Sequence, residues 1–177
     1  VIEYDKNLLQ KGNALEILSV EGNIENVEFF LDAEKTDPVY FYGFIDRIDR
    51  LNGNLRIIDF KTAKTKNLTV AAPKKEEDVE KLEKLFFKDD YKQAMQLCVY
   101  GYSVLNENKF PDNFLDCGIW SFAEVNKGVQ NLQLFGEKEI SAQLLERPMQ
   151  SIKNVILDIL DPEKNFVEEV KETAASN

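Results

Sequence analysis

Residues 40–61 read YFYGFIDRIDRLNGNLRIIDFK, and they predict the β-hairpin around which the rest of the chain is organised. Runs of β-branched and aromatic residues flank Asn52-Gly53, the strongest short-range signal for a two-residue type I′ turn. A turn centred on these two residues determines which positions of the two strands lie opposite each other, and a slip of one residue would exchange the two faces.

This register brings three chemically active side chains to one face of the hairpin. Asp46 faces Asp59, and Lys61 lies two residues beyond Asp59 on the same face, because side chains alternate along a strand. Directly opposed Cβ atoms are roughly 4.5–5.5 Å apart, so the two carboxylates repel each other unless a cation lies between them. The pattern therefore indicates a divalent metal site, with a solvated sheet face as the alternative.

Asp46, Asp59 and Lys61 are suited to cutting a phosphodiester. Carboxylate oxygens bind Mg²⁺ or Mn²⁺, and such an ion lowers the pKa of a bound water and offsets charge on the phosphate. Lys61 would orient the attacking water or stabilise the pentavalent phosphorus. The backbone carbonyl of Phe60 is a further candidate ligand.

The other face of the hairpin carries a structural pair. Asp49 opposes Arg56, and this opposite-charge cross-strand contact requires no catalytic explanation. Of the two aspartates in IDRID, the pattern therefore assigns Asp46 to chemistry and Asp49 to the ladder.

Composition narrows the function further. The chain has 177 residues with 44% hydrophobic content, which suits one globular domain. It has no histidine, which excludes a Ser-His-Asp site and a histidine-ligated zinc. Cys98 and Cys117 lie in apolar runs and are expected to be buried free thiols of a cytosolic protein. The net charge of −10 argues against nucleic acid as a partner unless the positive charge is local.

Hydrophobic patterns predict the remaining elements. Helices are expected at residues 1–14, 77–88 and 91–105, and from Pro148 in a first turn to about residue 160, with a buried face of Ile152, Val155, Ile156 and Ile159. Strands are expected at residues 15–21 and 27–31, separated by Gly22-Asn23, and at residues 114–122 and 129–135. Pro38 is expected at the start of a strand.

Lysines follow the hairpin closely, at Lys64, Lys66, Lys74 and Lys75. The segment from residue 62 to residue 90 is either a solvated loop and helix surface or a mobile flap whose lysines contact a phosphate backbone. In the second interpretation Lys64 lies near the DNA.

Three motifs in order resemble the PD-(D/E)XK nuclease superfamily. They are GFIDRID at residues 43–49, IIDFKT at residues 57–62 and QLCVY at residues 96–100. The match is to bacterial RecB/AddB-like nuclease domains fused to helicases or inactivated helicases, and the flanking VIEYDKNLL and ILDPEKNF give weaker support. Without the resemblance, Gln96 and Tyr100 would indicate only one face of an amphipathic helix.

The resemblance implies an α/β fold with a central mixed sheet flanked by helices, and an active site where the sheet forks. It implies that Asp46 and Asp59 bind the metal, that Lys61 is the catalytic lysine, and that Gln96 and Tyr100 lie near the DNA. We expect one domain over residues 1–177, excised from a larger bacterial cytoplasmic helicase–nuclease protein.

Two features depart from such relatives. They often carry an upstream histidine or glutamate, for which this chain offers only Glu21 or Glu28, each of which also reads as a surface residue at a strand end. Many close with a cysteine cluster, whereas this chain has no iron–sulfur motif. The expected function is a Mg²⁺-dependent DNA exonuclease of recombination and repair. The alternatives are a weakly active module that binds DNA or scaffolds a helicase–nuclease complex, and a small acidic metal-binding or interaction domain.

Overall fold

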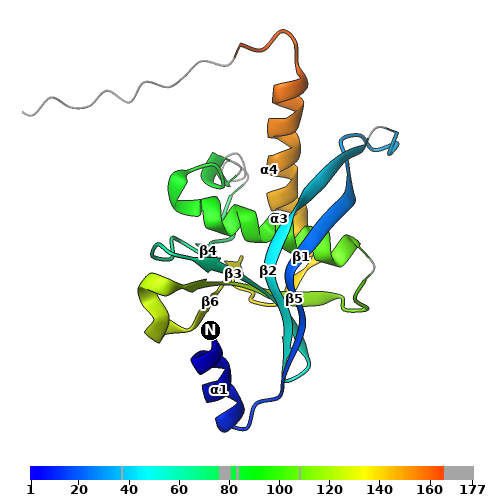
Figure 1. The fold of residues 1–177 in the computed structure, drawn as a ribbon. Coiled ribbons are helices and arrows are strands. Elements are labelled where there is room, and N and C mark those ends of the chain that lie inside the picture. Colours follow the sequence, from blue (N-terminus) through cyan, green and yellow to red (C-terminus); the bar gives the residue numbers. More distant parts are fainter. Residues whose placement is uncertain (37, 76–80, 83, 108, 166–177) are drawn as a thin grey trace, which may run out of the picture.

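The computed structural model describes residues 1–36, 38–75, 81–82, 84–107 and 109–165. Within them a central mixed β-sheet is flanked by helices, so the predicted fold class is confirmed (Figure 1). The strand order is β1-β2-β3-β5-β6, and β8 pairs with β5. These strands are β1 Leu15–Phe30, β2 Pro38–Leu51, β3 Asn54–Lys61, β5 Phe114–Ser121, β6 Val129–Asn131 and β8 Ile140–Ser141.

The predicted hairpin is confirmed. Asn52 and Gly53 both have positive φ, 54° and 87°, as a type I′ turn requires. The β2–β3 register is the predicted one from the Leu51/Asn54 pair to the Arg47/Ile58 pair. Pro38 begins β2, as expected for a residue that cannot donate to a ladder.

The sheet forks beyond Arg47 and Ile58. The ladder between β2 and β3 ends there, whereas β3 continues in parallel pairing with β5 as far as Lys61 and Ser121. Residues 38–46 of β2 pair only with β1, so the two strands leave the sheet as a two-stranded arm (Figure 1).

The predicted break at Gly22-Asn23 is wrong, because β1 runs unbroken from Leu15 to Phe30. The irregular positions are absorbed as register shifts, one between Ile17 and Ser19 and one between Ile24 and Val27. Such bulges insert an extra residue while the pairing resumes on either side.

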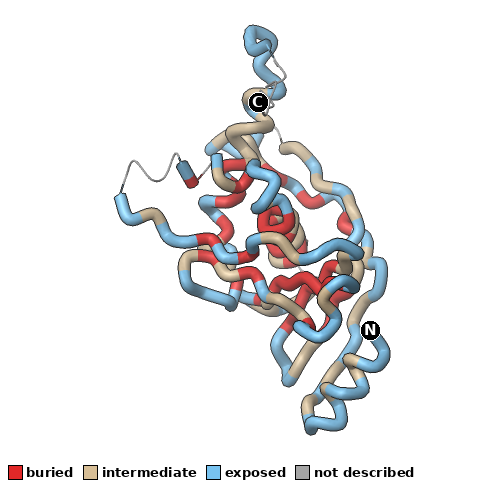
Figure 2. Tube along the Cα trace, turned by 90° about the vertical axis from the view of Figure 1, so that its left-hand side faces the viewer, coloured by how far each residue is buried: buried red, intermediate tan, exposed pale blue. Residues whose placement is uncertain are grey.

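Helices α1 Ile2–Gln10 and α3 Lys92–Asn106 correspond to the predicted ones. Met95 and Cys98 of α3 are buried, and Tyr102 and Leu105 pack against the same core, as the predicted stripe requires. Cys98 and Cys117 are buried free thiols, and burial raises the pKa of both. Figure 2 shows that the buried residues gather where the sheet and α3 meet.

Helix α4 Ala142–Leu160 begins earlier than predicted. Ser141 caps it by accepting a hydrogen bond from the Leu144 N–H, so Pro148 lies inside the helix and not in its first turn. The buried residues lie in its first half, at Leu145, Pro148, Met149 and Ser151, whereas Ile159 of the predicted buried face is 58% exposed. Ile152 and Ile156 pack partly against the core.

The remaining elements are short. The expected strand at residues 129–135 is divided into β6 and β7 Gln133–Leu134, and β7 pairs with β4 Thr69–Val70 in a second sheet. The 3₁₀ turns η1 Asp89–Tyr91 and η2 Phe122–Lys127 follow the lysine-rich segment and β5. The helix expected at residues 77–88 lies partly outside the described residues. No described helix is long and apolar enough to cross a membrane.

Candidate functional site

Asp46, Asp59 and Lys61 meet at the fork of the sheet. Asp46 lies in β2 just where this strand leaves β3, and Asp59 and Lys61 lie near the end of β3. The expected Asp46/Asp59 ladder pair does not form, because the pairing stops one position earlier. Instead the Asp46 Oδ2 accepts a hydrogen bond of 2.6 Å from the Phe60 N–H. A side chain thus replaces the backbone acceptor that the departing strand would have offered.

Asp59 is a buried carboxylate whose negative charge is only partly compensated by neighbouring groups. Its side chain is 4% exposed, and its Oδ2 lies 2.8 Å from the Lys61 Nζ. Beyond this ion pair, that oxygen has no hydrogen-bond partner among the described residues. The pKa of Asp59 is raised, chiefly by burial; Lys61 opposes the shift and the Asp46 charge adds to it.

Helix α3 supplies two further polar groups to this site. The Lys61 Nζ donates to the Gln96 Oε1 at 2.9 Å, and the Gln96 Nε2 donates to the Tyr100 hydroxyl at 2.8 Å. The pKa of Tyr100 is raised, first by burial and then by the charges of Asp59 and Asp46, while Gln96 opposes the shift. Gln96 therefore holds the lysine ammonium in place, and Tyr100 holds Gln96.

The donor set fits a small divalent cation. Asp46 and Asp59 are close enough for the charge of Asp46 to shift the pKa of Asp59, and the buried Asp59 Oδ2, whose contact is the Lys61 ammonium, is the kind of oxygen that a cation binds. Within the described part of the chain, no group of three or more Asp, Glu, His or Cys side chains is arranged to hold a metal.

The two upstream glutamates differ in position. Glu21 lies between Val20 and Gly22, which pair with Arg47 and Ile45, so it is level with Asp46 on the neighbouring strand. Glu28 pairs with Tyr40, six residues from Asp46, and is not brought to the site.

The segment after Lys61 is anchored at two points. The Thr65 N–H donates to Glu124 at 3.0 Å, and the Lys66 N–H donates to the Gln93 Oε1 at 2.8 Å. Lys127 and the Thr65 N–H lower the pKa of Glu124 to about 2. The exposed Lys64 lies between β3 and these anchors, whereas Lys66 is engaged by Asp89 in an ion pair.

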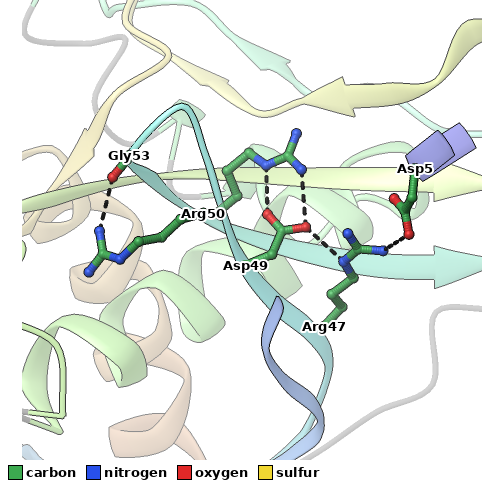
Figure 3. Close-up of polar contacts among 6 residues, drawn as sticks. Asp5, Arg47, Asp49, Arg50 and Gly53 are labelled. Carbon is green, nitrogen blue, oxygen red and sulfur yellow. Dashed lines mark hydrogen bonds and ion pairs between the residues drawn. The ribbon is translucent and has the colours of Figure 1, made fainter. Parts of the chain in front are cut away.

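The sequence predicted only half of a buried charge network behind the site. The expected Asp49–Arg56 pair is confirmed, with contacts of 2.7 and 3.0 Å. Arg47 also donates to Asp49, at 2.7 Å, and to Asp5 of α1, at 2.8 Å (Figure 3). Asp5 lies 42 positions from Arg47, and no local pattern relates the two residues.

A search of curated proteins found no match to the chain. A family comparison did find one, over residues 3–171, to the PD-(D/E)XK nuclease superfamily. This match covers nearly the whole chain, including the forked sheet with Asp46 and Asp59. The chain belongs to the PD-(D/E)XK nuclease superfamily.

Proposed function

We propose that this chain is a metal-dependent DNA nuclease that hydrolyses phosphodiesters in an exonuclease manner. The observation that carries the proposal is the buried Asp59 carboxylate, which lies beside Asp46 and whose Oδ2 is 2.8 Å from the Lys61 ammonium. An inert scaffold would have no reason to keep two carboxylates and an ammonium at this fork, since burying charges costs free energy.

Each residue has a role that its contacts support. Asp46 and Asp59 would bind Mg²⁺ or Mn²⁺, with the Phe60 carbonyl as a further ligand, and the ion would supply Lewis acidity toward water and phosphate. Lys61, positioned by Gln96, would donate to the attacking water or to the developing phosphorane charge. Tyr100 and the exposed Lys64 would contact the DNA backbone.

The cellular setting is proposed on the three motifs alone. Their order resembles that of RecB/AddB-like nuclease domains, which implies a bacterial cytoplasmic enzyme of recombination and repair that works with a helicase or helicase-like partner. Such a partner would deliver DNA to a chain whose own net charge of −10 does little to attract it.

A catalytically weak module that binds DNA or scaffolds a helicase–nuclease complex is the second candidate. Two observations favour it. In the described residues neither Glu21 nor Glu28 completes a third acidic ligand, and the net charge is strongly negative.

Titration of the chain with Mg²⁺ and Mn²⁺ on end-labelled linear and circular DNA separates the two. We expect metal-dependent cleavage of the linear substrate, and a loss of at least about a hundredfold in Lys61→Ala, because the ammonium acts on the reacting group. Lys138→Ala, which removes an exposed lysine from the turn after β7, is the control and should cleave like the wild type. Equal cleavage by Lys61→Ala and wild type would refute the assignment, and the absence of cleavage with either metal would favour the scaffold.

A further inference from the structure

Three exposed aromatic side chains follow one another along the β1–β2 arm. Tyr40, Tyr42 and Phe44 of β2 are 47%, 67% and 66% exposed. They alternate with Phe41 and other inward-facing residues, and Phe41 packs on Phe29 with ring centroids 5.2 Å apart. One face of the arm is therefore part of the core, while the other presents three rings to solvent.

These rings lead directly to the candidate site. The β1–β2 pairing is regular from the Asn23/Phe44 pair to the Val20/Arg47 pair, so Phe44 and Asp46 are alternate residues of an unbroken strand. Alternate residues project to the same side, which places Phe44 on the side of Asp46. The aromatic row, defined as Tyr40, Tyr42 and Phe44, thus ends two residues from the proposed metal ligand along β2.

The spacing of the row suits a single strand of nucleic acid. Alternate residues of an antiparallel strand are about 6.8 Å apart. This is about twice the 3.4 Å rise per nucleotide of a stacked strand. A single strand extended to about twice that rise can therefore offer one base to each ring. Bases stack on exposed aromatic rings whatever their sequence, but only when they are unpaired.

The charges around the row favour contact through bases over contact through phosphates. Tyr40 has Glu28 as its cross-strand partner, and Phe44 has Asn23. The Tyr42 hydroxyl donates to the Asn26 side chain at 2.7 Å, which orients the ring while leaving its surface open. Glu28 is acidic and Asn23 is neutral, so neither partner offers a positive charge to a phosphate.

We propose that Tyr40, Tyr42 and Phe44 form a base-stacking track that guides unpaired nucleotides toward Asp46, so that the substrate is single-stranded at this site. This inference deepens the proposed nuclease function and rests on it for the occupant of the track. A protein partner that covers the same aromatic row is the competing occupant, and the experiment below discriminates between them.

The test measures binding by fluorescence anisotropy with metal chelated, so that no cleavage occurs. The probes are a labelled oligothymidylate, an abasic strand of the same length, and a duplex. We expect wild type to bind oligothymidylate about tenfold more tightly than the abasic strand. Phe44→Ala should lose about tenfold for oligothymidylate and almost nothing for the abasic strand or the duplex, whereas Phe44→Trp should retain wild-type affinity.

The matched control is Phe114→Ala. Phe114 is 46% exposed at the beginning of β5, at the opposite end of the parallel β3–β5 pair from Lys61. This variant should bind all three probes like wild type. The dependence of affinity on salt should change little in Phe44→Ala, because stacking releases few counterions.

Several results would overturn the inference. The first is that wild type does not bind oligothymidylate, the second is that it binds the abasic strand equally well, and the third is that Phe44→Ala binds with unchanged affinity. Each of these results would favour a protein partner as the occupant of the aromatic row. Cleavage of DNA together with any of these results would refute the base-stacking track and would support the nuclease assignment. Base-dependent binding without cleavage in the presence of any metal would refute the nuclease assignment and would support the base-stacking track for unpaired DNA.

Discussion

Asp59 is the site residue whose buried charge lowers the stability of the metal-free fold. Its carboxylate is buried beside Asp46, and Lys61 compensates only in part, so its pKa lies above the ordinary value. A raised pKa means that the folded state binds a proton more readily than the unfolded state. The metal-free fold therefore loses stability as pH rises from the ordinary carboxyl range through the raised pKa of Asp59.

Asp59→Asn should stabilise the metal-free protein while abolishing cleavage. In EDTA at neutral pH we expect a melting temperature about 2–4 °C above wild type, which corresponds to about 1 kcal/mol for a chain of this size. The difference should shrink as pH falls below the carboxyl range, since wild-type Asp59 is then protonated.

Addition of Mg²⁺ is the control for this variant. It should raise the melting temperature of wild type, because an ion that binds only the folded state stabilises it, and should leave Asp59→Asn unchanged. A variant less stable than wild type at every pH would show that the Lys61 ion pair outweighs the cost of burial.

At the level of elements, the hairpin was predictable because its information is local. Asn52-Gly53 specifies the turn, the turn specifies the register, and the register separates Asp46 from Asp49. The fork was not predictable by extending the ladder, because where β2 leaves β3 depends on the contact of Asp46 with the Phe60 N–H. Pro38 marked a strand start correctly, but Pro148 did not mark a helix start, because the Ser141 cap lies seven residues earlier.

Asp49→Ala should act on stability. Asp49 is completely buried and holds both Arg47 and Arg56, so its removal leaves two buried guanidinium groups without their shared partner. We expect a loss of about 3–5 kcal/mol in the free energy of unfolding, measured by urea denaturation.

Asp112→Ala is the matched control for the buried network. It breaks the Arg50–Asp112 pair, which is bidentate but partly exposed, and should cost about 1 kcal/mol or less. Selective loss of cleavage in Asp49→Ala at normal stability would instead assign the network to catalysis.

For the whole molecule, burial is uneven. Strand β3 is paired with β2 over much of its length and with β5 from Arg56 to Lys61, and its Ile57 is completely buried. In contrast, α1 has no buried residue, and Leu160 at the end of α4 is 61% exposed. Sequence periodicity located α1 and α4 but overestimated how far α4 is buried. The extent of burial depends on which other segments cover a face, and a single helix does not encode that.

Amide hydrogen exchange should therefore be graded across the molecule. We expect the slowest exchange in β3 and the adjoining part of β5, and exchange that is faster by orders of magnitude in α1 and in residues 157–160. Because Asp5 ties α1 to Arg47, Asp5→Ala should accelerate exchange throughout residues 2–10 and leave β3 unchanged. Glu3→Ala removes an acidic residue from the same first turn and should have a smaller effect. Equal acceleration by both variants would mean that helix electrostatics, and not the Asp5–Arg47 contact, holds α1 against the sheet.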